Sequence, residues 1–72
     1  MDTLDLHGVR HHDAERVVEN FVVSCDFPAL VITGNSPRMK SIVQDVAKRF
    51  SLDARAESYL NLGALIVNEI DR

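Results

Sequence analysis

Cysteine is nearly absent from this sequence, and long hydrophobic runs are absent altogether. The single cysteine, Cys25, cannot form an internal disulfide, which favours a reducing compartment such as the cytoplasm. No apolar run approaches the roughly 20 residues that a membrane-spanning helix needs. Residues 1–7 lack both the basic and the apolar region of a signal peptide. We therefore expect a cytoplasmic protein that does not enter a membrane.

An excess of basic residues, the usual sign of a nucleic-acid-binding protein, is also missing, since the formal net charge is −3. The charge is nevertheless uneven. Residues 35–56 hold five basic and two acidic side chains, whereas the rest of the chain holds three basic and nine acidic ones. Phosphate groups respond to this local field rather than to the total charge. The alternative interpretation is a mixed surface that only keeps a small protein soluble.

The 72 residues contain no repeat, no low-complexity tract and no linker, and 46% of them are apolar. This composition is typical of one globular domain, here spanning residues 1–72. A chain of this size buries only about 60% of the surface of its unfolded form. So small a core would gain stability from association, which makes a homodimer a possible state.

Hydrophobic periodicity predicts four strands. Alternation in TLDLH predicts the first, and LDARAE predicts an edge strand with charges on one face. The nearly continuous apolar run ALVIT predicts a central strand buried on both faces or nearly so. Residues 58–63 are either an extension of a strand or a hairpin loop. The predicted strands are residues 3–7, 29–33, 52–57 and 64–70.

Two helices are predicted between these strands. Apolar residues recur at helical spacing from Ala14 to Cys25, which places Cys25 in the core, and Asp13 either caps this helix or lies in its first turn. Ser36 and Pro37 are a favourable cap and first residue for the second helix. Its apolar stripe comprises Met39, Ile42, Val43, Val46, Ala47 and Phe50.

The order β-α-β-α-β-β predicts an α/β fold of the α+β two-layer sandwich type, with a four-stranded mixed sheet. Right-handed crossovers would place both helices on one face of this sheet and leave the other face open. Leu4 and Leu6 then belong under the helices, and the alternation turns Asp5 and His7 toward the open face.

The first two strands point to a common binding edge. A helix connects them, so they are parallel, and their carboxyl ends lie at one edge of the sheet, where ligands of open α/β sheets gather. Gly8 and Gly34 follow these ends and allow positive φ, and each is followed by a helix N-terminus that favours anions. Arg38 and Lys40 add positive charge there. A phosphodiester fits such a pocket, although Ser36-Pro37 can also be explained as no more than a favourable helix cap.

Other polar residues allow weaker interpretations. His7, His11 and His12 lack the spacing of a metal site, so we expect no bound structural metal, while Mg²⁺ held by Asp5 and substrate phosphates is a possible cofactor. We expect His11 and His12 to be exposed near a helix N-terminus. Tyr59 can stack on a base or lie in the core or rim. Four further basic side chains either contact phosphates or lie on solvated helix faces: Arg10, Arg16, Lys48 and Arg49. A solvated helix face is the favoured interpretation for Arg16 and Lys48.

Three stretches stand out: LDLHG in the first strand, VITGN in the second and GALIV in the last. In their order, and over essentially the whole chain, they resemble the Smr (small MutS-related) domain. Asp5 and His7 match the acidic and imidazole positions of the first motif. Thr33 and Gly34 match the start of its TGxG loop, and Gly63-Ala64 matches the late glycine-alanine. Ser36 stands where the second glycine of the loop is expected.

The resemblance implies a two-layer sandwich similar to the C-terminal domain of translation initiation factor three. It also implies nucleic-acid binding with endonuclease activity. His7 would act as general acid or base, Asp5 would orient the imidazole, and the loop amides after Gly34 would stabilise the developing charge. The alternative is that Asp5 caps or pairs locally and His7 bonds a backbone group. The expected nucleic-acid-binding residues are Gly8, Arg10, His11, Thr33, Gly34, Asn35, Ser36, Arg38 and Lys40.

Two functions stay open at this point. The first is an endonuclease that cleaves RNA or nicks DNA by hydrolysis or transesterification. The second is a non-catalytic nucleic-acid-binding or adaptor module, which the serine in the loop and the acidic balance of the chain favour. The sequence does not choose between DNA and RNA.

Overall fold

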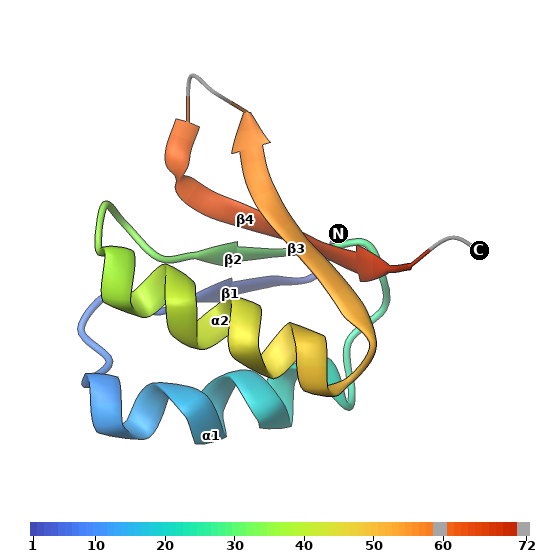
Figure 1. Ribbon diagram of the computed structural model, residues 1–72, viewed down its shortest axis with the longest axis horizontal. Coiled ribbons are helices and arrows are strands. Elements are labelled where there is room, and N and C mark those ends of the chain that lie inside the picture. The colour runs from blue at the N-terminus through green and yellow to red at the C-terminus, as the bar shows by residue number, and fades with distance from the viewer. Residues whose placement is uncertain (59–60, 71–72) are drawn as a thin grey trace.

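The computed structural model describes residues 1–58 and 61–70, and it is an α+β fold with a four-stranded mixed sheet and two helices (Figure 1). The order β-α-β-α-β-β is confirmed. Neither helix in the described part of the chain is long and apolar enough to span a bilayer. The elements are β1 (Thr3–Asp5), α1 (His11–Val22), β2 (Ala29–Ile32), α2 (Pro37–Arg49), β3 (Leu52–Ser58) and β4 (Asn61–Glu69).

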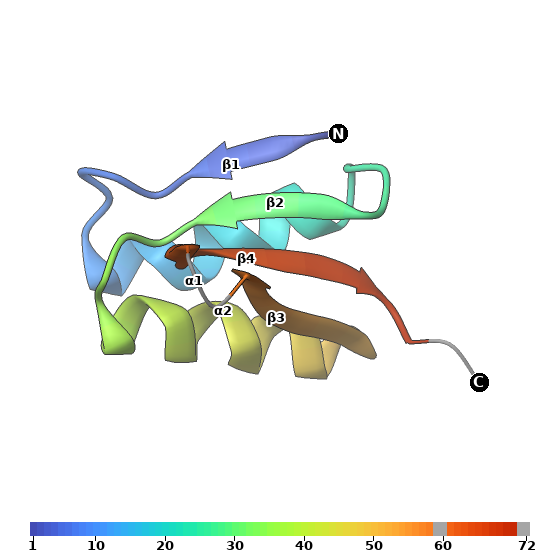
Figure 2. The ribbon, with the colours of Figure 1, turned by 90° about the horizontal axis from the view of Figure 1, so that it is seen from above.

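The sheet has the strand order β1-β2-β4-β3. β1 and β2 run parallel with Leu4 opposite Val31, and β2 and β4 run antiparallel with Val31 opposite Leu65. β3 pairs only with β4 and forms an edge of the sheet, as its alternating charges predict. Figure 2 shows both helices on the same side of the sheet, so one face is covered and the other is open.

The core lies between the covered face and the helices. Its largest fully buried side chains are all valines: Val18, Val31, Val43, Val46 and Val67. Leu6 is 2% exposed and Leu4 packs against this cluster, which confirms that both lie under the helices. On β2, Ala29 and Val31 are buried whereas Leu30 and Ile32 are only half-buried. The central strand is therefore less enclosed than predicted, because nothing in the described residues is layered on its second face.

Local sequence explains where the helices begin. α1 starts at His11 with Arg10 at its N-cap and no side-chain cap, and Asp13 lies in its first turn, one of its two expected places. α2 starts at Pro37, and the Ser36 hydroxyl accepts a hydrogen bond from the Met39 amide at 3.1 Å. The predicted capping of α2 is thus confirmed.

Two residues depart from the predicted helical stripes. α1 ends at Val22, before Cys25, which is half-buried in the connection to β2 and not part of the buried core. Phe50 is the C-cap of α2 and is 39% exposed. Both side chains follow the last turn of their helix, where the helical period no longer places them against the sheet.

The strand boundaries also differ at two places. β1 ends at Asp5 and not at His7, although the Leu6 amide still donates to the Ile32 carbonyl at 2.9 Å.

β4 begins at Asn61, so the alternative of a strand extension is correct for residues 61–63. Ser58 pairs with Asn61, and the pairing register shifts between Ala56 and Ser58. The neighbouring ends of β3 and β4 rise beyond the rest of the sheet in Figure 1. Tyr59 lies outside the described residues.

Candidate nucleic-acid interface

Two loops meet at the carboxyl ends of β1 and β2. Figure 2 shows the β1–α1 loop and the β2–α2 loop at the same end of the molecule, together with the first turns of both helices. Gly8 has φ +83° and Gly34 has φ +65°, so both glycines adopt the left-handed conformation that the sequence predicts for them. The fold therefore brings the two predicted loops together at one edge.

Asp5 supports the first loop through the backbone. Its Oδ1 accepts a hydrogen bond from the His7 amide at 2.8 Å, and both residues are exposed. Within the described chain, no hydrogen bond or ion pair joins the Asp5 carboxylate to the His7 imidazole. This arrangement matches the predicted alternative in which Asp5 caps the turn. Among the described residues, the second carboxylate oxygen, Oδ2, and the imidazole take part in no hydrogen bond or ion pair.

The second loop is tied to β4. The amides of Thr33 and Gly34 each donate to the Gly63 carbonyl at 2.9 Å. The Thr33 hydroxyl lies 2.9 Å from the Gly34 carbonyl oxygen and 3.3 Å from that of Gly63, and Thr33 is only 8% exposed. Two of the predicted ligand residues, Thr33 and Gly34, thus direct these donors into the protein rather than toward a ligand.

The other predicted residues in the second loop and the first turn of α2 are at least partly exposed. Asn35 and Arg38 are exposed, and Ser36 and Lys40 are half-buried. The Ser36 hydroxyl oxygen accepts from an amide, so its hydrogen stays available for donation. None of the ion pairs among the described residues involves Arg38 or Lys40.

The first turn of α1 completes this edge. Arg10 and His11 are exposed and take part in no ion pair within the described chain. His12 lies 3.5 Å from Asp13, whose carboxylate is also 3.7 Å from Arg16. In residues 1–58 and 61–70, no three His, Cys, Asp or Glu side chains are grouped to hold a metal ion. The Asp13 carboxylate therefore lies within reach of both His12 and Arg16.

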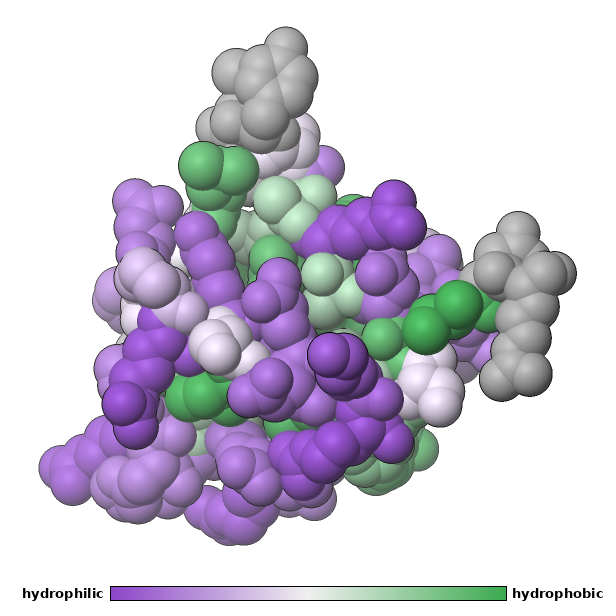
Figure 3. Space-filling model, viewed as in Figure 1, coloured by the Kyte–Doolittle hydropathy of each residue, from purple (hydrophilic) through white to green (hydrophobic). Residues whose placement is uncertain are grey.

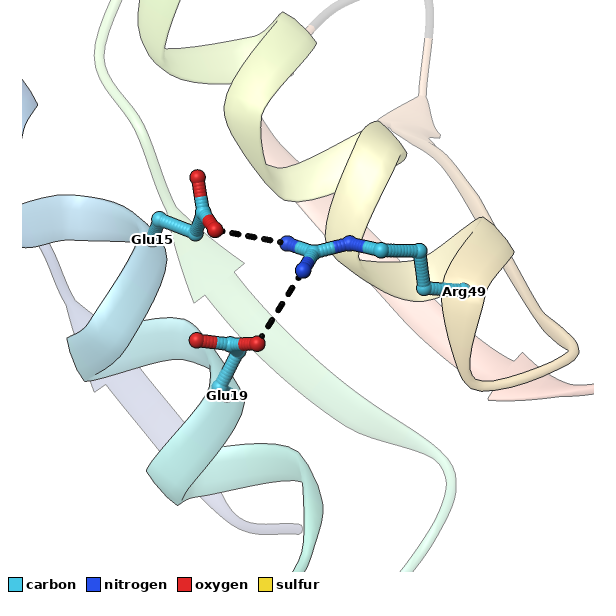
Figure 4. Close-up of polar contacts among 3 residues, drawn as sticks. All are labelled: Glu15, Glu19 and Arg49. Carbon is cyan, nitrogen blue, oxygen red and sulfur yellow. Dashed lines mark hydrogen bonds and ion pairs between the residues drawn. The ribbon is translucent and has the colours of Figure 1, made fainter.

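Arg49 forms ion pairs with α1, a role that the sequence does not predict. Its guanidinium lies 3.2 Å from Glu15 and 3.2 Å from Glu19, and so bridges the two helices, as Figure 4 shows. The sequence contains no signal for this contact, because the partners are 30 or more positions apart and meet only when the helices pack. Arg49 is therefore a link between α1 and α2 and not part of the candidate interface.

Cys25 has no character of a catalytic thiol. Burial raises its pKa above the usual value, and the carboxylates of Asp2 and Asp26 raise it further, while a backbone hydrogen bond acts in the opposite direction. A nucleophilic cysteine needs a lowered pKa. Cys25 also lies at the end of α1 opposite to the two loops.

A hollow of about 500 Å³ lies elsewhere on the molecule. It is lined by residues of β3 and β4 such as Asp53, Arg55 and Ile66, and none of the predicted site residues lines it. Hydrophilic side chains cover most of the face in Figure 3, including the end where both helices begin. Such a polar edge suits an extended polyanion better than a small apolar ligand, which prefers an enclosed pocket.

Comparison with protein-family models, curated proteins and solved structures finds no match to this chain.

Proposed function

We propose that this chain is a Smr-like domain that binds nucleic acid at the edge formed by its two glycine turns. The observation that carries the proposal is the convergence of these turns with three cationic side chains, Arg10, Arg38 and Lys40, that have no ion-pair partner in the described chain. Helix N-termini contribute further attraction for phosphate through their unpaired amides and the helix dipole.

The proposed activity is cleavage of a phosphodiester bond, with His7 as general acid or base. In hydrolysis, His7 takes a proton from the attacking water, the P–O bond to the leaving oxygen breaks, and that oxygen receives a proton. In RNA, the ribose 2′-hydroxyl can replace the water and give a cyclic phosphate. The cationic side chains at the edge offset the charge that develops on the phosphoryl oxygens.

Cleavage assays with matched variants test this activity. Wild-type, His7→Ala and Asp5→Asn proteins would be incubated with labelled single-stranded, duplex and branched RNA and DNA, with magnesium or with EDTA. Asparagine keeps a side-chain oxygen that can accept the His7 amide, so the turn is preserved while the charge is removed. His12→Ala is the control, because His12 is an exposed histidine at the same end of the molecule.

We expect His7→Ala to lower the cleavage rate by about 10²–10⁴-fold, the usual contribution of a general acid or base. His12→Ala should cleave at nearly the wild-type rate. Product ends distinguish hydrolysis from transesterification, and EDTA reveals any need for Mg²⁺. Full cleavage by His7→Ala would contradict a catalytic role for this histidine.

A non-catalytic binding or adaptor module is the second candidate. Two observations favour it: the Asp5 carboxylate bonds the His7 amide and not its imidazole, and Ser36 replaces the expected glycine of the loop. This candidate predicts salt-dependent binding without turnover by purified protein. Absence of any binding at low salt would exclude both functions.

A second copy of the chain is a further proposed partner. β3 is an edge strand of seven residues. If two such strands paired in antiparallel fashion about Ala54, Asp53 of each copy would lie opposite Arg55 of the other. Sedimentation over a range of protein concentrations tests this dimer, and a monomer throughout would contradict it.

A cytoplasmic location also belongs to the proposal. It rests on the single cysteine, which needs no oxidising compartment, and cell fractionation tests it.

A further inference from the structure

Thr33 is a buried residue of the candidate interface, and both its amide and its hydroxyl are bonded. It directly follows β2 (Ala29–Ile32), and only 8% of it is exposed. Its amide, the Gly34 amide and its hydroxyl all approach the Gly63 carbonyl, at 2.9, 2.9 and 3.3 Å. The second and third motif stretches of the sequence, 30 positions apart, are therefore joined at one carbonyl oxygen.

The hydroxyl has a second and shorter contact. It lies 2.9 Å from the Gly34 carbonyl oxygen, so the single hydroxyl hydrogen is shared between two carbonyls with the Gly34 oxygen nearer. The hydroxyl thereby holds the Gly34 carbonyl toward the protein interior. This bond lies within the turn at which Gly34 adopts φ +65°.

The orientation of this carbonyl determines the orientation of the next amide. In a trans peptide, the C=O and the following N–H point in opposite directions. The described chain has its one cis bond at Phe27–Pro28, so the Gly34–Asn35 peptide is trans. With the Gly34 carbonyl held inward, the Asn35 N–H points away from Thr33, and Asn35 is exposed. A partial negative charge is removed from the edge and a donor is presented there.

We propose that Thr33 is a positioning residue, whose hydroxyl orients the Gly34–Asn35 peptide so that its N–H faces a bound phosphate. This inference rests on the proposed function. It replaces the sequence-based expectation of a direct contact, since the hydroxyl is already bonded inside the protein and too buried to reach a ligand.

Substitutions at this position separate the hydroxyl from the shape of the side chain. Thr33→Val removes the hydroxyl and keeps the branched shape, and Thr33→Ser keeps the hydroxyl. Ser24→Ala is the matched control, since the Ser24 hydroxyl also donates to a backbone carbonyl, that of Asn20 at 3.1 Å, at the opposite end of α1. The probes are short fluorescein-labelled single-stranded DNA and RNA, and the readout is anisotropy as a function of salt.

We expect Thr33→Val to bind about three- to tenfold more weakly, as for the loss of one hydrogen bond, with Thr33→Ser and Ser24→Ala close to wild type. The dependence of affinity on salt should not change in Thr33→Val, because no cation is lost. Arg38→Ala, in contrast, should reduce the slope of log K against log salt by about one. Thermal unfolding monitored in parallel confirms that each variant is folded.

A measurement on the wild-type protein covers the case in which Thr33→Val does not fold. In a titration followed by amide NMR, the Asn35 amide should shift on binding, while the Thr33 and Gly34 amides stay protected from exchange. Equal binding by Thr33→Val and wild type, or an Asn35 amide that does not respond, would overturn the positioning role alone. If the wild-type protein binds neither probe, the proposed function fails, and the positioning role fails with it.

Discussion

Asp5 and Gly8 show how two single residues form the first loop. The Asp5 carboxylate accepts the His7 amide at 2.8 Å, and Gly8 turns the chain at φ +83°. The Val9 amide then donates to the Leu6 carbonyl at 3.0 Å, which closes the turn before α1. Asp5 thus satisfies a backbone donor that β1 leaves behind when it ends. Its position beside His7 has a structural reason that holds whether or not the pair does chemistry.

Gly34 offers a direct test of backbone conformation. A Cβ added at this glycine would meet no atom within 4 Å, so any destabilisation must come from φ +65° itself. We expect Gly34→Ala to lower the free energy of unfolding by about 1–2 kcal/mol. Gly34→Asn should lower it less, because asparagine tolerates this conformation. Urea unfolding measures both, and equal losses for alanine and asparagine would contradict this explanation.

α2 is positioned by contacts at both of its ends. Ser36 caps α2 at the end beside the second loop, and Arg49 joins the last turn of α2 to Glu15 and Glu19 of α1. The cap bonds a backbone amide in one fixed geometry, whereas the ion pairs join exposed, flexible side chains. The helix cap and the ion pairs should therefore contribute differently to the free energy of unfolding.

Substitution of Ser36 tests the helix cap. Ser36→Ala should lower the free energy of unfolding by about 1 kcal/mol, since the Met39 amide loses its acceptor. Ser36→Gly, which introduces the glycine expected from the proposed Smr-like loop, should lower the free energy of unfolding by only roughly a few tenths of a kcal/mol. Thermal or urea unfolding measures both values. A glycine variant that is as unstable as the alanine variant would show that the hydroxyl does more than cap the helix.

Arg49→Ala tests the link between the helices. The three side chains are each at least 36% exposed, so solvent screens the pairs and we expect a loss of at most about 1 kcal/mol. The difference from wild type should shrink at high salt. Nucleic-acid binding should not change, in contrast to Arg38→Ala. A large loss of binding in Arg49→Ala would return this residue to the interface.

The whole molecule consists of one sheet with one covered face. Its largest fully buried side chains are all valines, and the neighbouring ends of β3 and β4 extend beyond the rest of the sheet (Figure 1). A chain of 72 residues has a stability of about 4–11 kcal/mol by the usual value per residue. One well-chosen core substitution can therefore remove a large share of it.

Leu6 and Leu62 provide a matched pair of positions to test how much stability one core substitution removes. Leu6 is 2% exposed beneath the helices, and Leu62 is 52% exposed near the start of β4. Leu6→Ala should lower the free energy of unfolding by about 2–5 kcal/mol through lost burial and the cavity left behind. Leu62→Ala should stay within about 0.5 kcal/mol of wild type. Equal losses in urea unfolding would mean that the described core is not the one that stabilises the fold.

Features that depend on neighbouring residues in the chain could be predicted from the sequence. The cap at Ser36, the positive φ of Gly8 and Gly34, and the covered side of Leu4 and Leu6 all follow from local conformational preference and from periods of two and 3.6 residues. The common edge of the two loops follows from the parallel connection of β1 and β2. The fold class and the common edge of the two loops could therefore be predicted from the sequence.

Features that depend on contacts distant in sequence required the tertiary structure. The bridge from Arg49 to Glu15 and Glu19 exists because two helices pack side by side, and Thr33 turns inward because β4 supplies the Gly63 carbonyl beside it. The same holds for the Asp5 carboxylate, which has both the His7 amide and the His7 imidazole as candidate partners. The structure shows that it bonds the amide. Local patterns state what a side chain can bond, but only the assembled fold determines which partner lies within reach.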